Sequence, residues 1–225
     1  MRGKLIVIEG TDCSGKETQS KLLIDRIRKI GLQIDRYSFP SYETPTGKII
    51  GGPYLGKEHL GKGWFEEGAS NVDPKVASLY YAADRKYNIH KIIWLLENGI
   101  NVILDRYVYS NMAHQAGKLR KKDERLKMYE WLDNLEFKLL ELPKPDISVF
   151  LHMPLDKIRE LAIDREENLD EHELDREYLE LAEKAYFELV DIYNFKTIEC
   201  SYNNEIRKIE DINDELFNYV INFLK

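Results

Sequence analysis

A segment near the N-terminus restricts the fold of this chain more than any other. Four apolar residues, Leu5 to Ile8, lead into a loop bounded by Gly10 and Gly15, and Lys16 follows at the start of a helical pattern. Glycines let the backbone N–H groups of such a loop turn towards one anion, and the positive end of the next helix faces the same point. The segment therefore predicts a phosphate-binding loop between a buried strand and a helix.

One position in this loop departs from the usual pattern. The residue after the lysine is usually Ser or Thr and binds magnesium, but here it is Glu17, and Thr18 comes next. Two interpretations stay open for Glu17: its carboxylate joins the water shell of the ion, or it points to solvent from the first turn of the helix. The loop by itself indicates a bound nucleoside triphosphate and leaves the reaction undefined.

The composition is that of a soluble globular protein. The chain has 225 residues, enough for one well-buried domain, and 43% of them are hydrophobic and 32% charged. Its apolar runs are too short to span a bilayer, and a formal net charge of −7 argues against a general nucleic-acid surface. The two cysteines, Cys13 and Cys200, form neither a disulfide framework nor a metal pattern. We therefore expect a cytoplasmic protein without membrane or nucleic-acid partners.

Apolar runs alternate with helical patterns along the chain. Strands are expected at Leu5–Glu9, Gln33–Ser38, Asn101–Asp105, Ile147–His152 and Lys196–Cys200. Helices are expected at Lys16–Ile30, Thr44–Gly51, Pro74–Asn98, Asp123–Glu141, Leu155–Arg165, Glu177–Asn194 and Asp211–Leu224. This alternation predicts an α/β fold with a parallel sheet and right-handed crossovers. We expect a single domain over residues 1–225, because no linker-like boundary interrupts the pattern.

Two stretches of the sequence lack a clear period. The stretch Gly51–Asn71 is rich in glycine, and a loop of this length inside a compact domain is usually functional or mobile. The stretch Glu166–Asp175 is almost wholly polar and acidic, and it lies between the predicted fourth strand and a long helix. An ordinary solvated linker and a lid over a bound nucleotide both explain it, and its position favours the lid.

Four cationic residues are spread along the chain: Lys16, Arg85, Arg106 and Arg165. Transfer of a phosphoryl group between two nucleotides needs cations from several elements, because two polyanions must be held in line. Arg106 follows the carboxyl end of a predicted strand, which is the edge where ligands bind in open α/β sheets. For Arg85 and Arg165, a salt bridge or a solvated surface charge is an equally good explanation.

Four segments resemble thymidylate kinases, and they occur in the order found in that family: GTDCSGKETQ, YSFPSYETPTG, LYYAADR and DRYVYSNMAHQAGK. The resemblance extends from residue 5 to about residue 190, and the DRYxxSN and FPxY…G stretches are more specific than the phosphate-binding loop. It implies a P-loop kinase fold, in which helices flank a parallel sheet of about five strands as a three-layer sandwich. It also implies a lid at about residues 165–176.

On the donor side, the resemblance implies that the loop cradles the phosphates of ATP, with Lys16 on the β- and γ-oxygens. The implied ATP-binding residues are Gly10, Thr11, Asp12, Cys13, Ser14, Gly15, Lys16, Glu17 and Thr18. The implied catalytic residues are Lys16, Asp12, Arg106 and Arg165, and the implied contacts of Mg2+ are Asp12, Asp105 and Glu173. Some members carry an arginine where this chain has Cys13, so the transition-state cation is expected from the lid, at Arg165.

On the acceptor side, the resemblance implies a pocket for dTMP, in which Tyr81 stacks on the thymine ring, Arg85 bonds the base edge and Arg106 grips a phosphate. The implied dTMP-binding residues are Phe39, Pro40, Tyr42, Tyr81, Arg85, Arg106, Ser110, Asn111 and His114. A place in the core also explains Tyr81, unless the neighbouring Tyr80 is the one that packs inward. His114 stands where many members have a tyrosine beside the deoxyribose, so sugar discrimination stays open.

The resemblance implies ATP-dependent phosphorylation of dTMP to dTDP in the synthesis of dTTP, with Mg2+, by a homodimeric protein. No general base is needed, because the attacking phosphate oxygen is already ionised, and catalysis rests on positioning and charge. Two alternatives stay open. One is a kinase for another nucleoside monophosphate or for a deoxynucleoside. The other, which Glu17 motivates, is a nucleotide-binding P-loop protein without transfer activity.

Overall fold

The computed structural model describes residues 2–11, 14–57, 59–158 and 176–224. In these ranges the central element is a parallel sheet of five strands in the order β2-β3-β1-β4-β5. The strands are β1 (Leu5–Gly10), β2 (Ile34–Ser38), β3 (Asn101–Asp105), β4 (Ile147–His152) and β5 (Lys196–Glu199). The predicted parallel sheet is therefore confirmed, and each predicted strand ends within one residue of the observed one.

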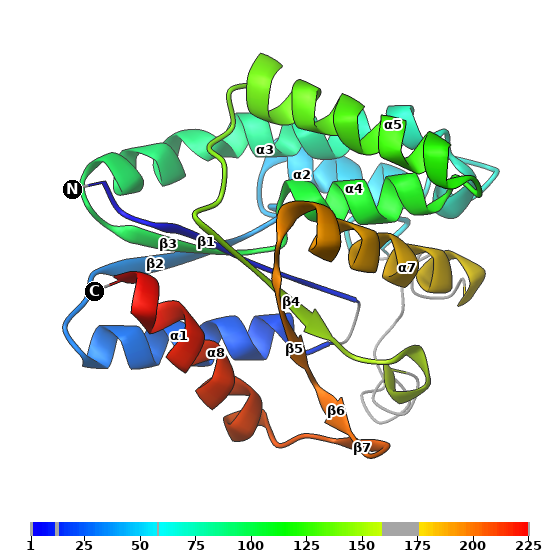
Figure 1. The fold of residues 1–225 in the computed structure, drawn as a ribbon. Helices are drawn as coiled ribbons and strands as arrows, with labels where there is room; N and C mark the ends of the chain where they lie inside the picture. Colours follow the sequence, from blue (N-terminus) through cyan, green and yellow to red (C-terminus); the bar gives the residue numbers. More distant parts are fainter. Residues whose placement is uncertain (1, 12–13, 58, 159–175, 225) are drawn as a thin grey trace.

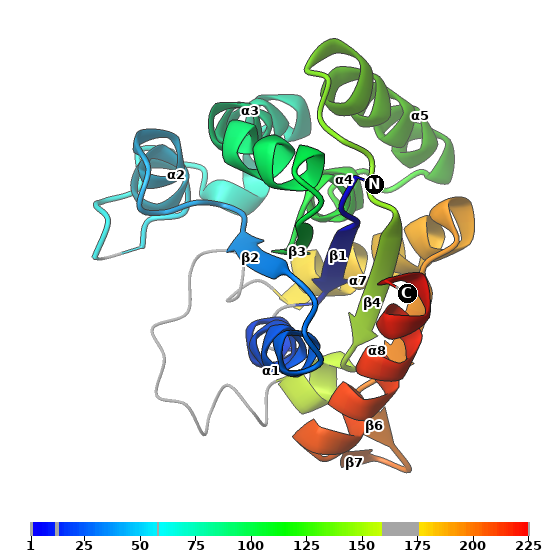
Figure 2. The same ribbon diagram turned by 90° about the vertical axis from the view of Figure 1, so that its left-hand side faces the viewer.

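Helices cover both faces of the sheet, which gives three layers (Figures 1 and 2). The helices of one face are α3 (Pro74–Glu97), α4 (Val108–Gly117), α5 (Lys122–Leu132) and α7 (Arg176–Tyr193), and those of the other are α1 (Lys16–Lys29) and α8 (Ile209–Leu224). Successive side chains of a strand point to opposite faces. Leu5 and Val7 of β1 therefore pack in the first core, and Ile6 and Ile8 pack in the second. Among the described helices, none has the length and apolar character needed to cross a membrane.

The glycine-rich segment after β2 has more structure than its sequence pattern predicts. The helix expected at Thr44–Gly51 is present as α2 (Pro45–Ile49), and the glycine-rich stretch that follows adds a π-helical turn η1 (Ile50–Tyr54) and a 3-10 turn η2 (Ala69–Asn71). A Cβ atom on Gly52 would lie 2.5 Å from the carbonyl oxygen of Leu60, so this turn packs backbone against backbone. Tyr54 then anchors a small core that is separate from the two faces of the sheet.

Two features are absent from the sequence-based prediction. The first is helix α4, which is enclosed on all sides: every one of its residues except His114 is buried. A helix without a solvated face shows no amphipathic period, and its buried polar residues resemble those of a loop. The other feature is a two-stranded hairpin of β6 (Ser201–Tyr202) and β7 (Glu205–Ile206).

Two predicted helices match the observed structure only over part of their length. Asp123–Glu141 is α5 followed by a π-helical segment, η3 (Asp133–Leu139), so the predicted helix is present with a change of winding. Of the helix predicted at Leu155–Arg165, residues 155–158 are helical, and the remainder lies outside the described residues together with the acidic stretch Glu166–Asp175.

The carboxyl ends of the three neighbouring strands β2, β3 and β1 meet at one edge of the sheet. The backbone N–H of Arg106, just after β3, donates to the carbonyl oxygen of Ile8 in β1 at 3.0 Å. The N–H of Phe39, just after β2, donates to the carbonyl oxygen of Asp105 at 3.1 Å. These bonds bring the residues after β2 and β3 beside the phosphate-binding loop, where ligands of open α/β sheets bind.

At the end of β4, an ion pair links the sheet to α7 and makes stability depend on pH. His152 Nδ1 lies 2.6 Å from Oε2 of Glu199, and its Nε2 lies 3.0 Å from Oε1 of Glu183. Burial alone lowers the pKa of the His152 imidazole, but hydrogen bonds and charge from the two carboxylates outweigh it, so the pKa lies above its usual value of about 6.5.

We expect the free energy of unfolding to fall as the pH rises above about 6.5 and through the folded-state pKa of His152. A folded-state pKa above the unfolded value contributes stability that is fully present below the unfolded pKa. His152→Asn should lower the stability near pH 6 and flatten this dependence, which urea denaturation at a series of pH values measures. The exposed His90→Asn is the control, and identical pH profiles for wild type and His152→Asn would contradict the expectation.

Candidate functional site

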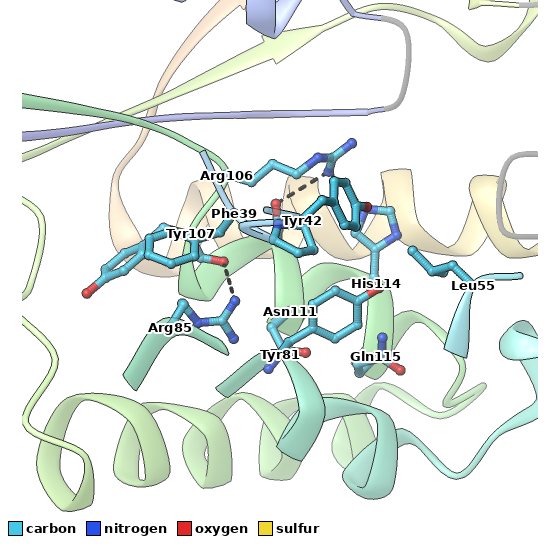
Figure 3. Close-up of a pocket in the computed structure, with 12 residues that line it drawn as sticks. Phe39, Tyr42, Leu55, Tyr81, Arg85, Arg106, Tyr107, Asn111, His114 and Gln115 are labelled. Atoms are coloured by element: carbon cyan, nitrogen blue, oxygen red, sulfur yellow. Dashed lines mark hydrogen bonds between the residues drawn. The ribbon is translucent and has the colours of Figure 1, made fainter. Parts of the chain in front are cut away.

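A pocket lies at the carboxyl edge of the sheet, between the chain after β2, helix α3 and helix α4 (Figure 3). It encloses about 530 Å³, part of which is open to solvent. Its lining residues are Phe39, Pro40, Tyr42, Leu55, Tyr81, Arg85, Arg106, Tyr107, Ser110, Asn111, His114 and Gln115. The structure thus brings together all nine residues that the family resemblance assigns to a dTMP pocket, although they come from three separate parts of the chain.

The phosphate-binding loop has the backbone geometry that its sequence predicts. Gly15 has φ 81°, a left-handed conformation that favours glycine. A Cβ atom on Gly10 would lie 2.5 Å from Ser14 Oγ and 2.6 Å from the carbonyl oxygen of Leu151, so only glycine fits there. Lys16 is buried, and its Nζ donates to the carbonyl oxygen of Thr11 at 2.6 Å. The predicted residues Asp12 and Cys13 lie outside the described residues, as do Arg165 and Glu173.

Glu17 lies on the solvent side of α1. Its side chain is exposed and forms an ion pair with Lys21 one turn further along, with Oε1 and Nζ 2.6 Å apart. Such pairs at spacing i, i+4 stabilise an exposed helix slightly. Of the two interpretations that the sequence leaves open, the structure has the one in which Glu17 points to solvent.

Arg106 stands at the centre of the site, between the loop and the pocket. Its backbone has φ 65°, which is unusual for a residue other than glycine and is typical of functional positions. One guanidinium nitrogen, Nη1, lies 3.4 Å from Ser110 Oγ and 3.3 Å from His114 Nε2, both on α4 (Figure 3). The side chain is therefore directed along the pocket wall by two acceptors.

Glu9, the residue before Gly10, stabilises the turn around Arg106 through hydrogen bonds. Its fully buried carboxylate accepts the backbone N–H groups of Tyr107 at 2.9 Å and Ser110 at 3.1 Å, and also the hydroxyl groups of Ser110 and Tyr186. Burial raises the pKa of the Glu9 carboxyl, and these hydrogen bonds with the charge of Arg106 oppose that shift. The sequence identifies Glu9 only as the end of a strand. The one feature that could have indicated its role is that it is a single charged residue at the end of an apolar run.

Arg85 forms a buried ion pair beneath the pocket. Its Nε and Nη2 donate to the two carboxylate oxygens of Glu136, and its Nη1 donates to the carbonyl oxygen of Tyr107 at 3.3 Å. Both side chains of the pair are almost fully buried. The salt bridge that the sequence allows for Arg85 is therefore present, and Arg85 also lines the pocket.

The two adjacent tyrosines of α3 have different surroundings. Tyr80 packs against Tyr54 and Phe65 in the small core, with ring centroids 6.2 Å from each. Tyr81 lines the pocket and meets Tyr54 edge-on, at 5.8 Å and 89°. Tyr80 is therefore the tyrosine that packs inward, and Tyr81 is the one that lines the pocket.

Gln115 is a pocket residue that the sequence motifs do not single out. Its side chain is fully buried, yet neither its amide oxygen nor its amide nitrogen has a hydrogen-bond partner among the described residues. The same holds for the amide oxygen of Asn111, one helical turn earlier, whose nitrogen donates to Glu136 Oε1 at 2.9 Å. Buried polar groups are nearly always paired in proteins, so three such atoms beside one pocket indicate a ligand with complementary groups.

Asp105, at the end of β3, has a cationic neighbour that the sequence does not reveal. Its Oδ2 accepts from Nη2 of Arg36 in β2 at 2.8 Å, and the Nε of Arg36 donates to Ser20 Oγ of α1 at 2.6 Å. The two residues are 69 positions apart, so only the pairing of β2 with β3 brings them together.

Comparison with known proteins gives one consistent answer. A family model for thymidylate kinase matches residues 8–212. A thymidylate kinase of Plasmodium falciparum is 29% identical over 97% of this chain and 96% of that protein, and one of Dictyostelium discoideum is 31% identical over 96% and 83%. A solved structure of a thymidylate kinase from Candida albicans has a TM-score of 0.72 at 27% identity, and the match covers 98% of this chain and 92% of that one.

Proposed function

The chain belongs to the thymidylate kinase family, and we propose that dTMP binds in the pocket between α3 and α4 and accepts the γ-phosphoryl group of ATP there. The enzyme is an ATP-dependent phosphotransferase that converts dTMP to dTDP. The geometry of the pocket supports separate places for the base and for the phosphate of dTMP.

We assign the acceptor site from the amide group of Gln115 and the amide oxygen of Asn111, which have no hydrogen-bond partner among the described residues. The edge of a thymine ring presents an N–H donor between two carbonyl acceptors. Gln115 offers one acceptor and one donor, and Asn111 offers a further acceptor, so both kinds of group on the base find a partner. Tyr81 supplies an aromatic face for the ring, which a base favours through stacking.

The phosphate of dTMP is assigned to the end of the pocket that Arg106 and Tyr42 line. A guanidinium matches the geometry of a phosphate, because its N–H groups donate in a planar fork. Lys16 holds the β- and γ-phosphates of ATP in the loop after β1, directly beside β3. The attacking oxygen of dTMP is already ionised, so these cations act by aligning two anions and by stabilising charge on the transferred group.

The residues at this edge fit a magnesium ion held mainly by phosphate and water. Mg2+ in kinases is bound through one or two carboxylates plus substrate phosphates. Over the described part of the chain, no three acidic, histidine or cysteine residues group into a protein-only metal site, whereas Asp105 provides one carboxylate beside Arg106. Asp105 is assigned to the water shell of the ion, with Asp12 and Glu173 as further candidates. When bound, the ion would neutralise charge on the ATP phosphates.

Self-association is part of the same proposal. Helix α3 leaves large apolar side chains exposed, among them Leu79, Tyr87 and Trp94, and α5 leaves Leu126 exposed. Exposed apolar groups of this size favour an interface over a solvated helix face. These residues support the homodimer that the family resemblance implies.

Gln115→Leu is expected to lower kcat/KM for dTMP by about 10- to 100-fold, because the base loses a donor and an acceptor that water cannot replace in a buried site. The same change should raise the stability of the ligand-free protein, since it removes two buried atoms without partners. Steady-state kinetics and thermal denaturation measure the two effects.

The control for this variant is Gln33→Leu, which changes an exposed glutamine in the same way. A comparison with dUMP distinguishes contacts to the base edge from contacts to the 5-methyl group, because dUMP has the same edge as dTMP and lacks only this methyl group. We expect Gln115→Leu to lower kcat/KM for both nucleotides by similar factors. An unchanged kcat/KM for both would remove Gln115 from the base site.

A further inference from the structure

Two tyrosines of α7 reach the residues that hold Arg106. Helix α7 lies along α4 (Figure 1), and Tyr178 and Tyr186 are two turns apart on its buried face. The hydroxyl of Tyr178 lies 3.1 Å from His114 Nδ1, and that of Tyr186 lies 2.9 Å from Ser110 Oγ. Each acceptor of the Arg106 guanidinium thus contacts the hydroxyl of a tyrosine, and both tyrosines belong to a helix that does not line the pocket.

The contacts of His114 define its protonation state. A guanidinium has only donors, so Nε2 of His114, which lies 3.3 Å from Arg106 Nη1, must accept with its lone pair. The ring proton is then on Nδ1, and it is donated to the hydroxyl oxygen of Tyr178. His114 in this geometry is neutral, in its Nδ1–H tautomer. A tyrosine hydroxyl can donate as well as accept, so Arg106 selects this tautomer, and the bond to Tyr178 fixes the orientation of the ring.

We propose that Tyr178 is a positioning residue of the kinase reaction: through the His114 ring, whose orientation it fixes, it directs the guanidinium of Arg106 towards the acceptor phosphate. The proposal rests on the phosphate-binding role of Arg106 given above. Tyr178 does not line the pocket, so its effect on dTMP passes through His114.

Two acceptors from different positions of α4 restrict the guanidinium more than one does. An unrestrained arginine side chain samples many rotamers, and a pair of fixed acceptors removes part of that freedom before substrate arrives. Ser110 Oγ is fixed by Glu9 and Tyr186, so the orientation of the His114 ring is the remaining variable. If the ring turned, Nε2 would move away from the guanidinium, and Arg106 would lose this restraint.

The test compares Tyr178→Phe with Tyr193→Phe in the full chain. Tyr193 is on the same helix, and its hydroxyl has no hydrogen bond to α4 among the described residues. For Tyr178→Phe we expect kcat/KM for dTMP to fall about 10-fold while KM for ATP stays unchanged, since misplacement of a catalytic group by a fraction of an ångström has effects of this size. Tyr193→Phe should match wild type in both.

A structural readout without substrate accompanies the kinetics. The nitrogen NMR signals of the His114 ring are expected to show a single Nδ1–H tautomer in wild type, and they should shift in Tyr178→Phe because Nδ1–H loses its acceptor. A second pair of variants covers the case in which Tyr178→Phe folds poorly: His114→Gln keeps a donor and an acceptor and should retain more activity than His114→Phe.

Failure of this proposal differs from failure of the proposed function. If wild type forms no dTDP, the function is wrong, whereas the ring signals still report the tautomer. The positioning role is overturned if the His114 signals and the dTMP kinetics of Tyr178→Phe both equal those of wild type. It is also overturned if His114 in wild type carries its proton on Nε2, or if His114→Phe is as active as His114→Gln.

Discussion

Lys16→Met is expected to lower kcat for dTDP formation by about 10³-fold, the size seen when one charge-stabilising donor is lost from an active site. The ammonium of Lys16 is held inside the loop by the carbonyl oxygen of Thr11, at the place that we propose for the phosphates of ATP. Methionine keeps the buried aliphatic stem and removes the charge, so the fold is retained. A coupled assay of ADP formation with saturating dTMP measures the effect.

The matched control is Lys21→Met, one turn later on the same helix, where the ammonium is exposed and pairs only loosely with Glu17. It should keep near-normal turnover. Circular dichroism of Lys16→Met confirms that α1 is intact. Turnover of Lys16→Met within a few-fold of wild type would remove Lys16 from the mechanism.

Arg106→Ala should lower kcat/KM for dTMP by at least about 10³-fold, comparable to the loss of an arginine that stabilises transferred phosphate in other kinases and hydrolases. Arg106 is the cation that the fold places between the loop and the pocket, and its backbone conformation is maintained by Glu9 beneath it. Alanine removes the guanidinium and leaves the turn in place. Steady-state kinetics with dTMP and ATP varied separately measure the loss.

Two further variants sharpen the Arg106 result. Arg106→Lys keeps the charge and loses the planar fork, so it should recover only part of the activity. Arg120→Ala removes an exposed arginine that pairs with Glu177 at the surface, and it should behave as wild type. Equal kinetics for Arg106→Ala and Arg120→Ala would show that Arg106 does not act on phosphate.

The sequence predicts the frame of this enzyme well because the frame depends on local patterns. The strand β1 is a continuous apolar run, and such runs are typical of parallel strands covered on both faces. The glycines of the loop are explained by local backbone geometry alone. Phe39 and Arg106 are found at strand ends because the alternation of strands and helices already implies a shared edge.

The residues that sequence patterns miss have partners that are distant in the chain. Gln115 belongs to α4, a helix that burial on all sides hides from periodicity, and its importance lies in hydrogen bonds that the described part of the protein does not make. Glu9 meets its donors 98 and more positions later in the chain. Only tertiary packing brings these groups together, which no spacing in the sequence encodes.

The central claim is that the pocket accepts dTMP and that its phosphate is the attacking group. The most direct measurement is product analysis after incubation with ATP and magnesium, with dTMP, dUMP, thymidine and no acceptor in parallel. We expect dTDP from dTMP, slower formation of dUDP from dUMP, no product from thymidine and little ATP hydrolysis without acceptor. Phosphorylation of thymidine, or ATP consumption without dTDP, would contradict the claim.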